Sequence, residues 1–165
     1  MANLAQMVNA IAPVVTTADG AVVQPIYYPF LLHSQSHLAV ALDALVVGEQ
    51  VPAPAPAGRW PYPLDDLGPF NLIDAAVTTD EPGSRLAMTV VNRSEAAERV
   101  EIRLSEREFA GTARVRYLTA SSDPSPVPGV QSASLSEFTE SPRGQVLVLD
   151  MPASSFASVE VEVGA

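Results

Sequence analysis

Few residues of this chain could do chemistry, and none of them completes a catalytic site. Hydrolysis of a glycosidic bond needs two carboxylates about 5 to 10 Å apart on rigid elements, one of them with a raised pKa. Glu160 and Glu162 share one face of a predicted strand, but valines alternate with them, so both acids are expected on a solvated outer face. Asp65 and Asp66 adjoin in a Pro-rich loop, where turn formation is the expected role. No catalytic residue is predicted.

Two histidines form the one candidate metal site. His33 and His37 lie four residues apart, so a helix would place both imidazoles on one face, where they could chelate a metal. The Glu of the HExxH pattern is missing, no third ligand is evident, and the chain has no Cys. Packing or capping against a neighbouring element is the expected role. Neither a metal nor another cofactor is predicted.

Two aromatic residues offer a possible surface for sugars. Trp60, which is the only Trp, and Tyr62 lie in the loop sequence GRWPYP. If exposed, their rings could stack on sugar faces; the alternative is that they fold back over a hydrophobic edge. The sequence has neither a GxSxG nucleophile elbow nor a Gly-rich phosphate loop.

Composition sets the class of protein to which these residues belong. The chain has 165 residues, of which 47% are hydrophobic, enough for one domain with a core. Its net charge is −10 and all nine bases are Arg, which excludes nucleic acid as a partner. The long uncharged run of residues 20–42 holds prolines and histidines and is not expected to cross a membrane. Because the first residues lack the positive region of a signal peptide, a cytoplasmic location is expected.

The elements that would position these residues begin with one helix. In residues 24–42, apolar side chains recur at spacings near three and four, which predicts a helix with one buried stripe. The stripe comprises Ile26, Tyr27, Phe30, Leu31, Leu38 and Leu42. Pro25 and Pro29 confine its regular part to the later residues. Before it, a short apolar segment at residues 10–15 and a turn at residues 18–20 predict a strand end and a loop.

The rest of the chain predicts strands around a Pro-rich loop. Six prolines make residues 51–70 an extended loop, bracketed by the alternating sets Leu42, Ala44, Val46 and Ile73, Ala75, Val77. The apolar run 86–92 predicts a strand covered on both faces, and further strands are predicted near 131–138, 145–151 and 156–163. Two half-solvated strands complete the set: Val100, Ile102 and Leu104 point inward in the first, and Ala113, Val115 and Tyr117 point inward in the second, with Arg114 and Arg116 outward. The predicted fold is mainly β, an antiparallel β-sandwich of about eight strands.

Three stretches of sequence are shared with a known family. They are ANLAQMVNAIAPVVTTADGAVVQPIYYPFLLHSQ, then LGPFNLIDAAVTTD with LAMTVVNRSEAAERVEIRL, and the ending MPASSFASVEVEV. They resemble the C-terminal part of α-L-arabinofuranosidases of glycoside hydrolase family 51, in which a (β/α)₈ barrel precedes a β-sandwich. The resemblance implies that residues 1–40 are a remnant of the last β/α unit of the barrel and that residues 41–165 are the sandwich. The loop at residues 121–129 departs from the family pattern.

The resemblance also implies what the chain does. The parent enzymes release terminal arabinofuranosyl groups from arabinan and arabinoxylan oligosaccharides with retention, using two barrel glutamates that this chain lacks. Gln6 and Asn3 match a family motif whose Gln points toward the bound sugar, so they are the predicted substrate-binding residues. The chain is thus expected to be an inactive C-terminal fragment whose partner is the rest of the barrel. The alternative is a stand-alone carbohydrate-binding or interaction module.

A barrel remnant without its barrel would expose apolar surface. Residues 1–40 are therefore expected to fold back onto the sandwich, to self-associate as a homo-oligomer, or to exchange their amide hydrogens fast.

Overall fold

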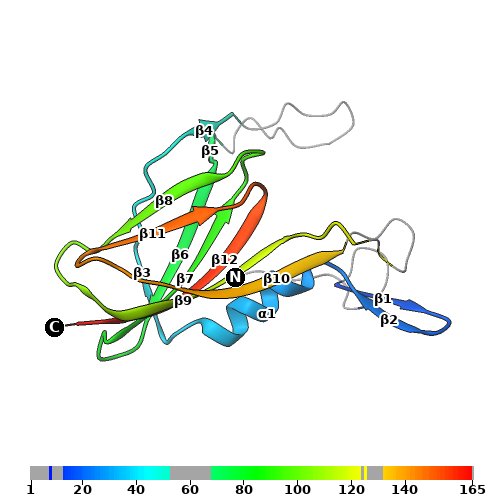
Figure 1. The fold of residues 1–165 in the computed structure, drawn as a ribbon, viewed down its shortest axis with the longest axis horizontal. Helices are drawn as coiled ribbons and strands as arrows, with labels where there is room; N and C mark the ends of the chain where they lie inside the picture. Colours follow the sequence, from blue (N-terminus) through cyan, green and yellow to red (C-terminus); the bar gives the residue numbers. More distant parts are fainter. Residues whose placement is uncertain (1–7, 9–12, 53–67, 124, 126–131, 165) are drawn as a thin grey trace.

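Alternating apolar residues build a β-sandwich with one helix packed against it. The computed structural model describes residues 8, 13–52, 68–123, 125 and 132–164 (Figure 1). The larger sheet is antiparallel and has six strands in the order β10-β9-β12-β7-β6-β3. Their bounds are β3 (Val40–Leu42), β6 (Ile73–Thr79), β7 (Arg85–Asn92), β9 (Phe109–Ala120), β10 (Ala133–Glu140) and β12 (Ser155–Val163).

The second sheet has two strands and faces the larger one. It consists of β8 (Glu98–Arg103) and β11 (Val146–Met151). Leu147, Leu149 and Met151 of β11 form one hydrophobic core with Val115 and Val159 of the larger sheet, all of them almost inaccessible to solvent. The six strands and the two strands together make the predicted eight-stranded antiparallel sandwich. The expected fold class is confirmed.

Several predicted faces are also confirmed. Val100, Ile102 and Leu104 pack against the core, because β8 meets the core on one face and water on the other. The strand β7 is covered on both faces: Met88 and Val90 lie in the core, while Ala87 lies on the opposite face beside the helix. Between β6 and β7, a turn holds Asp80, whose carboxylate accepts hydrogen bonds from the backbone N–H groups of Ser84 and Arg85, and Gly83 with φ +71°.

The N-terminal region holds a hairpin and a helix. The hairpin pairs β1 (Val14–Thr17) with β2 (Gly20–Val23), so the residues after the predicted turn form a strand rather than a loop. In Figure 1 this hairpin extends away from the sandwich. The helix α1 (Tyr27–Ser36) begins earlier than expected and includes Pro29, which lies in the first turn, where a backbone N–H has no partner inside the helix. The helix lies on β12 and β7, which is one of the three outcomes expected for the N-terminal region.

The predicted helix was wrong in its end and in its buried stripe. The helix stops at Ser36, because the backbone N–H of Leu38 donates to Thr78 Oγ1 at 2.9 Å and β3 then pairs with β6. The residue that anchors it is Leu32, at 1% exposure, which the predicted stripe omits, whereas Ile26 is 43% exposed. The apolar spacing indicated a helix, but the side that meets the sheet is set by packing.

The predicted strand at Leu42, Ala44 and Val46 was also wrong. Pairing ends at Leu42, and residues 43–48 belong to no strand. Leu45 and Val47 are 92% and 86% exposed. The chain pairs again where β4 (Gln50–Val51) meets β5 (Phe70–Asn71), so the two ends of the Pro-rich loop lie side by side. Residues 53–67 of that loop are outside the described residues, as is most of the loop at 121–129.

Candidate functional site

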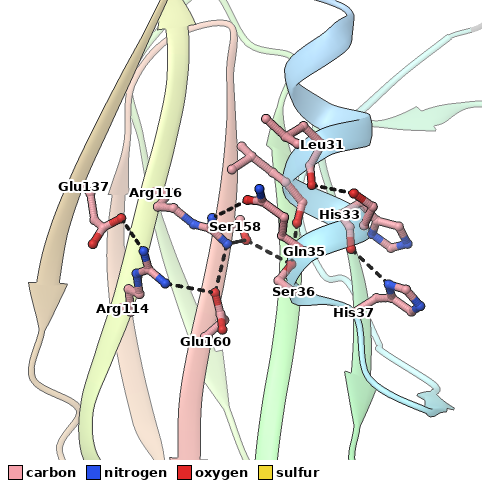
Figure 2. A network of polar contacts seen from close by, with 12 residues as sticks. Leu31, His33, Gln35, Ser36, His37, Arg114, Arg116, Glu137, Ser158 and Glu160 are labelled. Carbon is pink, nitrogen blue, oxygen red and sulfur yellow. Dashed lines mark hydrogen bonds and ion pairs between the residues drawn. The ribbon is translucent and has the colours of Figure 1, made fainter.

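Most of the predicted binding residues lie outside the described part of the chain. Asn3, Gln6, Trp60 and Tyr62 are among them, as is the pair Asp65 and Asp66. What the described residues do bring together is a polar network between α1 and the outer face of the larger sheet (Figure 2). This network lies where the N-terminal region meets the sandwich.

The helix contributes its last turn to the network. Ser36 is 4% exposed, and its hydroxyl donates to the carbonyl of Leu32 at 2.8 Å, which satisfies the hydroxyl donor inside the interface. Ser36 Oγ also accepts a hydrogen bond from Ser158 Oγ of β12, at 3.2 Å. Gln35 lies beside it and turns its side-chain oxygen toward the sheet (Figure 2). The polar end of α1 thus binds the sheet through specific partners, while Leu32 supplies apolar burial.

The centre of the network is Arg116 on β9. Its side chain is 9% exposed, and its guanidinium donates to Gln35 Oε1 at 3.0 Å, to Glu160 Oε1 at 2.9 Å and to Ser158 Oγ at 3.4 Å. A buried charge is costly unless it is paired and hydrogen bonded, and Glu160 provides the opposite charge here. Arg116 Nε is buried and has no hydrogen-bond partner within the described residues.

Charged pairs continue from this centre toward the sheet edge. Arg114 Nη2 lies 2.8 Å from Glu137 Oε2 on β10, and both side chains are half exposed. The hydrogen bond between them lowers the pKa of Glu137 below its ordinary value and raises the pKa of Arg114. Glu160 is reached at 3.9 Å by Arg114 and also by Arg85. Each of these carboxylates is held by arginine.

The prediction of a solvated outer face was wrong for Arg116 and Glu160. Both do point outward, as the alternation requires, but α1 contacts Arg116, which is 7% exposed, and arginines of the sheet surround Glu160, whose side chain is 23% exposed. Glu162, one pleat further along β12, is exposed as predicted. Alternation assigns a residue to a face of a sheet and says nothing about a helix that lies on it.

The two histidines close the end of the helix. Their rings stack with centroids 5.6 Å apart and an interplanar angle of 15°, and His37 Nδ1 lies 3.2 Å from the carbonyl oxygen of His33. The backbone N–H of His37 also donates to that carbonyl at 3.0 Å. Among the described residues, no three His, Cys, Asp or Glu side chains are grouped so that they could hold a metal ion. The histidine pair caps its own helix.

The network has the features of a structural contact between α1 and the sheet and lacks those of a hydrolytic site. A hydrolytic site needs a carboxylate with a raised pKa beside an open cleft, and the carboxylates at α1 are instead bound by arginines. One amide contact and a pair of serine hydroxyls join α1 to β9 and β12, while the ion pair of Arg116 with Glu160 lies within the sheet and orients the guanidinium. We find no helix in the described part of the chain that is long and apolar enough to span a membrane.

Comparisons with known proteins bear on what α1 attaches. Residues 1–153 match the family model described as the alpha-L-arabinofuranosidase C-terminal domain. The chain is 32% identical over 110 residues to intracellular exo-alpha-(1->5)-L-arabinofuranosidase 1 of Bacillus subtilis strain 168, which covers 66% of this chain and 19% of that protein.

Solved structures agree with the family match. The α-L-arabinofuranosidase of Thermotoga maritima in complex with arabinose matches 97% of this chain at 26% identity and a TM-score of 0.69. The thermostable family 51 α-L-arabinofuranosidase of Thermotoga petrophila RKU-1 matches 97% of it at 25% identity and a TM-score of 0.70. This chain spans 33% of the length of each of those two structures.

Proposed function

Because this chain belongs to the α-L-arabinofuranosidase C-terminal domain family, we propose that it is the accessory β-sandwich of a retaining α-L-arabinofuranosidase and holds the end of the catalytic barrel through α1. The observation that carries the proposal is the network around Arg116, since two polar contacts tie α1 to the sandwich: Arg116 donates to Gln35 and Ser158 donates to Ser36. Glu160, on the neighbouring strand of the sheet, pairs with the Arg116 guanidinium. An interface of this kind specifies one position of the helix.

On this proposal, the chain has two parts with different roles. Residues 1–40 are the last β/α unit of the barrel, with α1 as its helix, and residues 41–165 are the sandwich that supports it. Asn3 and Gln6 then lie at the end of the last barrel strand, where active-site residues of this fold gather. The substrates are arabinofuranosyl groups at the ends of arabinan or arabinoxylan oligosaccharides. The name of the Bacillus subtilis relative supports a cytoplasmic location.

A chimeric enzyme tests the supporting role. The C-terminal third of the Thermotoga maritima enzyme is replaced by this chain, and hydrolysis of an aryl α-L-arabinofuranoside is measured after heating. We expect the chimera to be active and to outlast the same enzyme truncated before that third. Arg116→Ala should shorten the half-life of the chimera at high temperature, whereas Glu162→Ala, the exposed control on β12, should leave it unchanged.

Two results would contradict the supporting role. One is a truncated barrel that survives heating as long as the chimera does. The other is a chimera in which Arg116→Ala and Glu162→Ala have the same half-life as the unmutated chimera.

A further inference from the structure

The sandwich is open along one side. A two-stranded sheet faces a six-stranded one, and between them lies a cavity of about 1130 Å³. Its walls are inward apolar side chains of β6, β7 and β8, together with residues 42–49. Among the described strands, β8 pairs only with β11. The edge of β6 that faces away from β7 pairs with β3 only at Val77–Thr79. Just before β6 begins, the backbone N–H of Leu72 donates to the carbonyl of Glu49. Residues 43–48, which we term the strap, run between those two points.

The register on either side of the strap nearly matches. Leu42 pairs with Val77 where β3 ends, and Gln50 pairs with Asn71 where β4 begins. Residues 43–49 therefore face residues 72–76, and the strap side is longer by two residues. Each β-bulge absorbs one extra residue, so two bulges absorb this excess. Gly48 is at the end of the strap, and nothing lies within 4 Å of the position its Cβ would take.

At the free edge of β6, one backbone N–H is already hydrogen bonded to the side chain of Asp74. The backbone N–H of Ala75 donates to Asp74 Oδ1 at 2.9 Å, so we infer that it points to the free edge rather than to β7. The other carboxylate oxygen of Asp74 accepts a hydrogen bond from Arg93 at 3.0 Å. In an antiparallel ladder, the backbone N–H and C=O groups of alternate residues point to the same neighbouring strand. Those of Val77 point to β3, so those of Ala75 point to the same edge of β6.

The strap has the side chains of a strand. Leu42, Ala44 and Val46 alternate in phase with Val77, Ala75 and Ile73, and all six line the cavity. Leu45 and Val47 are the most exposed large apolar residues of the described chain. An apolar run that is rich in β-branched residues and lacks proline favours pairing at an open edge.

We propose that the strap closes onto the free edge of β6 and joins β3 to β4 as one bulged strand. In the closed state Ala44 lies opposite Ala75 and Val46 lies opposite Ile73, so their side chains cover the cavity. The carboxylate of Asp74 leaves the Ala75 N–H, which then donates to the carbonyl of Ala44. Asp74 thus opposes closure by binding the Ala75 N–H, and the closed strap covers the open side of the cavity.

Disulfide trapping tests the register of closure. The chain has no Cys, so Ala44→Cys with Ala75→Cys adds the only thiols. Paired residues of a ladder have Cα atoms about 5.5 Å apart, which suits a disulfide. The matched control is Ala44→Cys with Ala76→Cys, one residue out of register and on the other face. In a glutathione buffer, we expect the effective concentration of the first pair to exceed that of the control by about tenfold or more.

Removing the Asp74 carboxylate should favour closure. Asp74→Ala, added to the in-register pair, is expected to raise its effective concentration further, while Arg93→Ala, which leaves Asp74 on Ala75, should change it less. Equal values for the in-register and control pairs would overturn the proposal, and so would a fall on Asp74→Ala. If mass spectrometry shows only intermolecular disulfides, the strap binds a second copy rather than β6, which also overturns it.

Discussion

At the scale of single residues, Glu160 supports the helix interface, because it neutralises the Arg116 guanidinium, which water barely reaches. Glu160→Ala should lower the free energy of unfolding by about 1 to 3 kcal/mol, since it leaves Arg116 buried and unpaired, with a reduction for the partial exposure of Glu160. Glu162→Ala, on the same strand and exposed, should change it by less than about 0.5 kcal/mol. Urea unfolding of both variants measures the difference, and equal values would contradict the assigned role.

A second residue-scale prediction concerns Tyr117 in the sandwich. Burial raises the pKa of its hydroxyl from 10.0 to about 12, and its ring lies 4.9 Å from that of Phe138. The pKa of the Tyr117 hydroxyl is higher in the folded chain than in the unfolded chain, so folding favours the protonated hydroxyl. The contribution of this hydroxyl to the free energy of unfolding is therefore complete below pH 10 and is lost as the pH rises toward about 12.

Tyr117→Phe removes the titrating hydroxyl and provides the test. We expect the loss of stability between pH 10 and 12 to be smaller in Tyr117→Phe than in the unmutated chain, as measured by urea unfolding at several alkaline pH values. A tyrosinate absorbance titration of the unmutated chain should show one hydroxyl that ionises late. Identical alkaline profiles for the two proteins would show that Tyr117 ionises freely in the fold.

Trp60 gives a residue-scale test of the alternative function. If its ring covers a hydrophobic edge, arabinoxylan or arabinan should not change its fluorescence, and because it is the only Trp the signal has one source. A saturable change that disappears in Tyr62→Ala would favour a carbohydrate-binding module instead.

At the scale of elements, α1 depends on one leucine. Leu32→Ala should cost about 2 to 5 kcal/mol of the free energy that holds the helix on the sheet, because Leu32 is 1% exposed. Hydrogen exchange should become faster throughout residues 27–36 while the amides of β7 and β12 stay protected. Leu45→Ala, at a leucine that is 92% exposed, is the control. Unchanged exchange in α1 would mean that the polar network alone fixes the helix.

The strands show which local patterns determine structure. The face of β8 could be predicted because Val100, Ile102 and Leu104 meet the core while Arg99, Glu101 and Arg103 meet water, so burial alone decides the alternation. Ala44 and Val46 also lie two residues apart, yet pairing stops at Leu42, and the next outward N–H of β6, that of Ala75, is bound by the carboxylate of Asp74. Periodicity describes one element, and register depends on two.

The same reasoning applies to the candidate site. Leu32 and Arg116 carry the interface, and neither could be assigned from the sequence, because each is buried by an element distant in the chain. The spacing of apolar residues placed a helix within residues 24–42 but determined neither its end nor the side that faces the sheet, and the observed helix spans Tyr27–Ser36. The substrate-binding role of Asn3 and Gln6 remains a prediction, since both residues are outside the described part of the chain.

At the scale of the whole molecule, the chain alone should have no hydrolase activity. On the proposed function, the acid/base and nucleophile glutamates belong to the rest of the barrel, and the described Glu137 and Glu160 are bound by arginines. We expect no hydrolysis of aryl α-L-arabinofuranosides above the buffer rate at high protein concentration. Turnover that survives repurification and is abolished by Glu160→Gln would contradict both the inactivity and the supporting role.

The order of strands in the larger sheet constrains synthesis of the domain. The strand β12 comes last of the eight sandwich strands from the ribosome, yet it lies inside the sheet, hydrogen bonded to β7 on one side and to β9 on the other. Until residues 155–163 have left the exit tunnel, two apolar strands lack their common neighbour and present open edges. We therefore expect the nascent sandwich to be prone to aggregation and to bind chaperones until residues 155–163 have left the tunnel, and we expect a premature stop before Ser155 to yield a product that aggregates.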